Sequence, residues 1–192
     1  MSHHIYHTRG LILGSIPTGE SNRFYKIFTE DLGLVGATAQ AVREGKSKLR
    51  YSLQDLSWVH LDLVHGREVW RITSAIEAER EMRNAEYGVL FARVCALVRR
   101  LLHGEGQNSA LFKELVAITE FLERESVALD DRVSFEALAA MRVLAHLGYF
   151  NTEHYKDFTI ARMWSRELLE AFGRVRPTAI RDINRALKET HL

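Results

Sequence analysis

The sequence predicts an α+β protein in two parts: a five-stranded barrel over residues 1–77, followed by an all-α helical bundle over residues 78–192. Two observations carry this prediction. In the first part, apolar residues alternate with a period of two, in short segments separated by turns that contain glycine. After Glu77, apolar residues recur every three or four positions, as on the buried face of a helix.

Five segments of the first part have the pattern of strands: they are short, turn residues bound them, and apolar and polar residues alternate in residues 24–29 and 56–64. They cover residues 7–15, 24–29, 34–41, 56–64 and 69–76. Residues 46–54, between the third and fourth strands, lack this alternation and could hold a helical turn. A five-stranded barrel with a helical piece at that place has the layout of an OB-fold, a common binder of single-stranded nucleic acids and oligosaccharides.

The second part predicts five helices. Apolar spacing places the first over residues 79–103, ended by Gly104, and Ser109 starts the second. Residues 130–133 separate the second helix from a third, which covers residues 134–147. A fourth covers residues 159–172, and Pro177 fits the first turn of a fifth.

Composition excludes several classes of protein. Hydrophobic residues make up 46% and charged residues 27% of the chain, as in ordinary globular proteins. No apolar run approaches the roughly 20 residues that cross a bilayer, so we expect no membrane partner. The single cysteine, Cys95, excludes an internal disulfide, and the first residues lack the pattern of a secretory signal. These features indicate a cytoplasmic protein.

The net charge of +1 says nothing about nucleic acid, but its distribution does. Between Arg43 and Arg50, four cations stand against Glu44 alone, a net charge of +3. Between Arg174 and Lys188, five cations stand against one aspartate, a net charge of +4. Such clusters on a nearly neutral chain indicate local contact with anions, although a solvated charged face explains them as well.

An OB-fold that binds nucleic acid combines a positive groove for the backbone with aromatic side chains for base stacking. The candidate backbone contacts are Arg43, Lys46, Lys48 and Arg50, followed by Arg9, Arg23 and Lys26. The candidate stacking residues are Tyr6, Tyr25, Trp58 and Trp70. For Trp58, core packing is the favoured interpretation.

The sequence contains no constellation typical of catalysis. A Gly-x-Ser-x-Gly elbow, a phosphate-binding P-loop and a His-Glu-x-x-His zinc motif are all missing. Cys95 lies in the apolar stripe of a predicted helix, where a buried small hydrophobe is expected. His3, His4 and His7 could bind a metal, but a flexible start with a few histidines is the favoured interpretation. We therefore expect no catalytic residue, no metal site and no cofactor.

Several motifs stand in a fixed order between Thr8 and Gln54. Gly10 precedes an apolar run, Gly19-Glu20 follows, and Phe28-Thr29 leads to a turn at Gly33. Lys46-Ser47-Lys48 completes the series. This order and spacing resemble the N-terminal OB domain of RecO, a family of bacterial recombination mediators. Leu144–Tyr149 and Ile183–Leu187 resemble helices of the same family more loosely.

The resemblance implies a set of binding functions in DNA repair and recombination. RecO-like proteins bind single- and double-stranded DNA, anneal complementary strands, contact the C-terminal tail of SSB, and act with RecR to help load RecA. It also implies association with the nucleoid. Many members carry a four-cysteine zinc site, which would fall after about Gly148, where this shorter sequence has no cysteine. Zinc is therefore not expected, and the chain represents either a compact zinc-free branch or a relative with altered duties.

Two other classes of function stay open at this stage. An RNA-binding OB-fold protein would differ in its preference between DNA and RNA oligonucleotides, because the 2′-OH is the chemical difference. A protein-interaction module would show no salt-sensitive binding of nucleic acid at all. An enzyme comes last, because no acid–base or nucleophile pair supports one.

Overall fold

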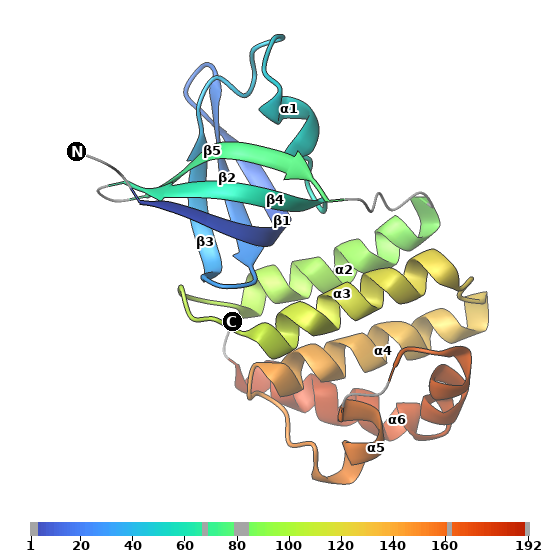
Figure 1. Ribbon diagram of the computed structural model, residues 1–192. Helices are drawn as coiled ribbons and strands as arrows, with labels where there is room; N and C mark the ends of the chain where they lie inside the picture. The colour runs from blue at the N-terminus through green and yellow to red at the C-terminus, as the bar shows by residue number, and fades with distance from the viewer. Residues whose placement is uncertain (1–3, 67–68, 79–84, 161–162, 191–192) are drawn as a thin grey trace. The chain divides into compact units, whose positions relative to one another are not determined.

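The computed structural model describes the chain in four stretches, residues 4–66, 69–78, 85–160 and 163–190. It forms two compact units (Figure 1). The barrel unit comprises Met1–Glu81 together with His103–Ser109, and the helical unit comprises Met82–Leu102 and Ala110–Leu192. The domain boundary that the sequence predicts, between residues 77 and 78, stays a prediction, because most of the connection after it lies outside the described residues.

Five strands close the barrel in the order β1-β2-β3-β5-β4. They are β1 (Ile5–Thr18), β2 (Asn22–Thr29), β3 (Gly33–Ala39), β4 (Trp58–His65) and β5 (Trp70–Glu77). The pairing of β3 with β5 is parallel and the other four are antiparallel. The short helix α1 (Leu49–Ser52) lies in the connection between β3 and β4 (Figure 1). This architecture confirms the predicted OB-fold.

The strand alternation that the sequence shows becomes the inside and the outside of the barrel. In β3, Val35, Ala37 and Ala39 are fully buried in the barrel core, and the residues between them are partly exposed. β1 is long enough to pair with β4 through Ile5–Leu11 and with β2 through Gly10–Thr18. A register shift between Ile12 and Gly14 lets the strand bend from one partner to the other.

The loop between α2 and α3 belongs to the barrel unit, although it lies far from the barrel in sequence. The backbone N–H of Leu34 donates to the carbonyl of Gly104 over 3.3 Å. The indole of Trp70 donates to the carboxylate of Glu105 over 3.0 Å. A Cβ at Gly33, whose φ is +73°, would lie 2.3 Å from the carbonyl oxygen of Gly106, so this close approach requires glycine.

The helical unit is built around four fully buried phenylalanines, one from each long helix, which are Phe91, Phe112, Phe135 and Phe172. The long helices are α2 (Ala85–Leu101), α3 (Ser109–Arg124), α4 (Leu129–His146) and α6 (Arg166–Glu189). A 3₁₀ turn, η1 (Glu153–Tyr155), and the short helix α5 (Lys156–Thr159) connect α4 to α6. Cys95 is 1% exposed, as its place in the apolar stripe predicts. None of the helices in the described stretches is long and apolar enough to cross a membrane.

Two sequence predictions for the helical part are wrong. α4 begins at Leu129 rather than at Ser134. Asp130 and Asp131, which the sequence predicts to lie between two helices, therefore lie in its first turn, where their negative charges interact favourably with the positive end of the helix dipole. Residues 159–172 and the stretch after Pro177 do not form two helices. Residues 166–172 and the stretch after Pro177 belong to one helix, α6, which Ser165 caps by accepting a hydrogen bond from the N–H of Leu168, and Thr159 is the last residue of the short helix α5.

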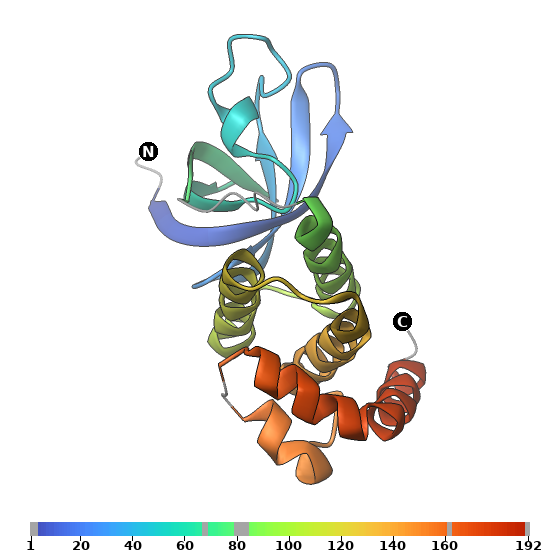
Figure 2. The same ribbon diagram turned by 90° about the vertical axis from the view of Figure 1, so that its right-hand side faces the viewer.

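Packing on both sides of Pro177 explains this continuous helix. α6 buries Leu169 and Phe172 before the proline and Ile183 and Ala186 after it. Burial of these side chains outweighs the hydrogen bond that the proline removes. Figure 2 shows α6 changing direction along its length, as a proline inside a helix is expected to cause.

Candidate nucleic-acid interface

The cationic segment Arg43–Arg50 leaves the barrel after β3 and returns through α1. Turn hydrogen bonds shape it: the N–H of Arg43 donates to the carbonyl of Ser21, and the N–H of Ser47 donates to the carbonyl of Glu44, both over 3.0 Å. All four of its cationic side chains are exposed. The segment therefore presents a concentrated positive charge to solvent beside the barrel.

A hollow of about 670 Å³ opens between this segment and strands β1 and β2. Three arginines line it, Arg23 from β2 and Arg43 and Arg50 from the cationic segment, and we call it the arginine hollow. Ser15, Tyr25 and Asp55 also line it. The three guanidinium groups against the single carboxylate give the lining a net charge of +2. The hollow is therefore suited to an anion.

Hydrogen bonds hold part of the arginine hollow in place. The guanidinium of Arg23 donates to the hydroxyl of Ser15 over 2.9 Å, and this hydroxyl donates to Asp55 over 2.7 Å. Nη1 of Arg43 donates to the carbonyl of Gly19 over 3.3 Å. Within the described stretches, the guanidinium of Arg50 has no hydrogen bond or ion pair, so all its donors are available to a ligand.

The hydroxyl of Tyr25 stays protonated at neutral pH. Burial raises the pKa of this hydroxyl, Asp55 raises it further, and the nearby Arg23 lowers it by less than burial raises it. Tyr25 therefore contributes a neutral hydrogen-bonding group to the hollow.

The other predicted contact residues do not line the arginine hollow. Lys46 and Lys48 are exposed on the cationic segment. Lys26 is exposed on the face of β2 opposite Tyr25, because neighbouring residues of a strand point to opposite faces. The guanidinium carbon of Arg9 lies 5.1 Å from the centre of the Trp58 ring, in a cation–π contact. Three of the seven predicted cations thus converge on one site.

The structure corrects the choice of Tyr25 and Trp70 as stacking aromatics and confirms core packing for Trp58. Tyr25, Trp58 and Trp70 are at most 6% exposed and present no ring face to solvent. Tyr6 is partly buried and packs edge-on against Trp70, with ring centres 5.0 Å apart. An aromatic residue that sequence analysis missed, Tyr51 in α1, is 72% exposed.

A helical pattern around Tyr51 could have revealed it. Leu49 and Leu53, four residues apart, both pack into the barrel core. In a helical turn the residue midway between them points away from that core. Tyr51, the next residue after Arg50 in the sequence, therefore presents its ring to solvent.

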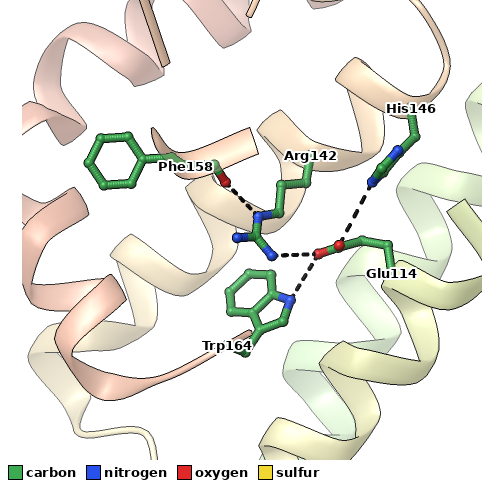
Figure 3. Close-up of polar contacts among 5 residues, drawn as sticks. All are labelled: Glu114, Arg142, His146, Phe158 and Trp164. Carbon is green, nitrogen blue, oxygen red and sulfur yellow. Dashed lines mark hydrogen bonds and ion pairs between the residues drawn. The ribbon is translucent and has the colours of Figure 1, made fainter. Parts of the chain in front are cut away.

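A second polar cluster lies inside the helical unit (Figure 3). Glu114 of α3 accepts hydrogen bonds from Arg142 of α4 over 3.1 Å and from the indole of Trp164 over 2.8 Å. Nε2 of His146 lies 3.7 Å from the second carboxylate oxygen. Burial would raise the pKa of Glu114, but His146, Arg142 and Trp164 together lower it below its ordinary value. This cluster joins α3, α4 and the segment before α6, which is a structural role.

No group of three His, Cys, Asp or Glu side chains among the described residues is arranged to hold a metal ion. Of the three histidines considered near the start, His3 lies outside the described residues. Nδ1 of His7 lies 2.6 Å from the carboxylate of Asp62 on the neighbouring strand.

Comparison with known proteins finds similarity to one family. Residues 1–78 match the family model described as the N-terminal domain of recombination protein O. A DNA repair protein RecO of Dehalococcoides mccartyi (strain CBDB1) is 29% identical over 126 residues, 64% of this chain and 50% of the relative. The RecO of Rubrobacter xylanophilus is 32% identical over 99 residues, 52% of this chain and 40% of the relative.

A third relative, the DNA repair protein RecO of Clostridium novyi (strain NT), is 27% identical over 132 residues, 66% of this chain and 50% of the relative. The chain thus spans about half the length of the curated relatives it matches.

Proposed function

Because the chain belongs to the RecO family, we propose that it is a DNA-binding protein of recombinational repair whose barrel unit holds the phosphate backbone. The observation that carries this proposal is the arginine hollow, where Arg23, Arg43 and Arg50 converge beside the exposed cationic segment. The role is one of binding rather than catalysis.

Phosphate contact by this surface follows from its chemistry. Arginine presents a planar fork of N–H donors that matches phosphate oxygens, and lysine adds a flexible point charge. Arg43, Lys46, Lys48 and Arg50 would contact successive phosphates, and Arg23 would reach the backbone from the strand. Arg9 and Lys26 are further candidates, although Arg9 already lies against Trp58.

Tyr51 would add base stacking to these backbone contacts. Its ring is 72% exposed, and stacking of a base on an aromatic side chain is worth about 1–3 kcal/mol. A base inside a duplex has both of its faces covered by its neighbours. Stacking on Tyr51 therefore favours a strand with unpaired bases.

We further propose that the protein takes part in annealing complementary strands and, with RecR, in loading RecA on DNA coated by SSB. The helical unit would receive the acidic, aromatic-ended tail of SSB, since a terminal carboxylate suits an arginine. Arg99 and Arg100, both exposed in the last turn of α2, are one candidate contact. The basic segment from Arg174 to Lys188 in α6, whose two end residues are exposed, is another. Association with the nucleoid would follow from DNA binding.

Alanine variants separate these two candidate contacts for the tail. A peptide of the SSB tail should bind the variant at one pair of basic residues more weakly than it binds the wild type. Two double variants are compared, Arg99→Ala/Arg100→Ala and Arg174→Ala/Lys188→Ala. If both bind the peptide as tightly as the wild type does, both placements are contradicted.

Fluorescence anisotropy tests the DNA-binding function directly. Single-stranded DNA, double-stranded DNA and RNA of one sequence are titrated with the protein at several salt concentrations. We expect binding of DNA that weakens as salt rises, because phosphate contacts release counterions. Preference for the RNA strand would instead support an RNA-binding OB-fold protein. Absence of salt-sensitive binding to every probe would support a protein-interaction module.

A further inference from the structure

We propose that the arginine hollow binds the phosphorylated end of a DNA strand, as a terminal phosphomonoester together with part of its nucleotide. This inference rests on the proposed DNA-binding function and names a ligand for one part of the surface. The rest of the cationic segment, with Lys46 and Lys48 outside the hollow, would contact internal phosphates.

Charge is the first argument. The lining of the arginine hollow carries a net charge of +2 from three arginines and Asp55. A phosphomonoester carries a charge of about −1.5 to −2 at neutral pH and has three strong acceptor oxygens. An internal phosphodiester carries one negative charge, so it would leave the lining with an uncompensated positive charge. The end of a strand therefore matches the hollow better than its middle does.

Size and shape are the second argument. A volume of about 670 Å³ lies within the roughly 300–1,000 Å³ that sites for whole small ligands occupy. The lining comes from two strands and from the β3–β4 connection, so a group that enters it can meet side chains from all three. A terminal nucleotide can enter a hollow of this volume, whereas a strand that only passes over a surface does not need one.

Preorganisation is the third argument. The hydroxyl of Ser15 accepts from Arg23 and donates to Asp55, which fixes this arginine before a ligand arrives. Arg50 lines the same hollow, and its guanidinium donors are unused within the described stretches. Because Arg23 is already fixed, less conformational entropy is lost when it binds a ligand. Arg50 can donate to a ligand without first breaking another hydrogen bond. Arg23 and Arg50 together therefore form a ready clamp for phosphate oxygens.

The test compares strands that carry the same number of phosphates but differ in whether one of them is terminal. A strand with a terminal phosphate is compared with a strand one nucleotide longer that ends in hydroxyl groups, so both carry the same number of phosphates. The phosphate is placed at the 5′ end in one probe and at the 3′ end in another. We expect the wild-type protein to bind one of the phosphorylated probes about tenfold more tightly, as charge-assisted hydrogen bonds would provide.

Variants locate this preference in the hollow. Arg50→Ala and Arg23→Gln should each bind the phosphorylated and the hydroxyl-ended probes alike, and circular dichroism should show that both remain folded. The matched control is Arg71→Ala on β5, an exposed arginine of the same barrel that does not line the hollow and donates to Gln40. This control should keep the preference of the wild type.

Each outcome bears on the inference. Equal binding of all end types by the wild type overturns it and leaves the proposed DNA binding intact, whereas no binding of any strand overturns both. A preference that survives in Arg50→Ala and Arg23→Gln also overturns the placement. A free nucleoside monophosphate that binds as tightly as the phosphorylated strand would identify a nucleotide site instead of a strand-end site.

Discussion

The guanidinium of Arg142 donates to the carboxylate of Glu114 over 3.1 Å inside the helical unit, where 1% and 11% of the two side chains are exposed. Nε of the same arginine donates to the carbonyl of Phe158 over 2.7 Å. The guanidinium also lies over the ring of Trp164, 4.8 Å from its centre. A charge buried this deeply needs such partners, because water no longer solvates it.

Glu114→Ala should therefore destabilise the helical unit strongly. The substitution removes the carboxylate that accepts from Arg142, whose side chain is 1% exposed, and removing one partner of a buried ion pair typically costs about 3–5 kcal/mol. Urea denaturation followed by circular dichroism at the helical band measures the change. The double variant Glu114→Leu/Arg142→Met should recover most of the loss, because it removes both charges. If the double variant is less stable than Glu114→Ala, the buried charge of Arg142 is not the main cause of the loss of stability.

The lowered pKa of Glu114 predicts a dependence of stability on pH. Because the folded state holds the proton less tightly than the unfolded state, the pair stabilises the protein above the ordinary pKa of 4.5. This stabilisation is lost as the pH falls below 4.5 and through the lowered pKa of the folded state. Urea midpoints measured from pH 7 to pH 3 should fall more steeply for the wild type than for Glu114→Gln. Parallel curves would show that Glu114 titrates alike in both states.

Removal of the acceptor for Trp70 should destabilise the barrel unit. Glu105→Ala leaves the indole N–H of a side chain that is 6% exposed without its partner, which costs about 1 kcal/mol. Glu105→Gln keeps an acceptor oxygen and should lose less. Tryptophan fluorescence during urea denaturation reports the change. Equal midpoints for wild type and Glu105→Ala would mean that the loop between α2 and α3 adds no stability through this bond.

Much of the fold was predictable because its signals are local. Alternation of buried and exposed residues in β3 can be read directly from neighbouring positions, and so can the apolar stripe around Cys95. The unbroken course of α6 through Pro177 could not, because side chains from other helices decide it. The pair of Glu114 and Arg142 is likewise invisible in a sequence that separates its members by 28 residues.

The candidate site also has one part that the sequence predicts and one part that only the fold reveals. The cationic segment is continuous in sequence, so counting charges finds it. The arginine hollow needs Ser15, Arg23 and Asp55 together, and only the closed barrel brings these distant residues to one place. Burial then removes Trp58 and Trp70 as stacking surfaces, whereas Tyr51 stays exposed because Leu49 and Leu53, on either side of it, pack into the barrel core.

The salt dependence of DNA binding by a quadruple variant tests the central claim most directly. Arg43, Lys46, Lys48 and Arg50 are changed to alanine together, and the affinity for single-stranded DNA is measured across a salt series. Each lost phosphate contact lowers the log–log slope by about 0.7, so the slope should fall by up to about 3 and binding should weaken for every sequence alike. A variant that circular dichroism shows to be folded, and that binds with the wild-type slope, would contradict the assignment of the backbone contact to this segment.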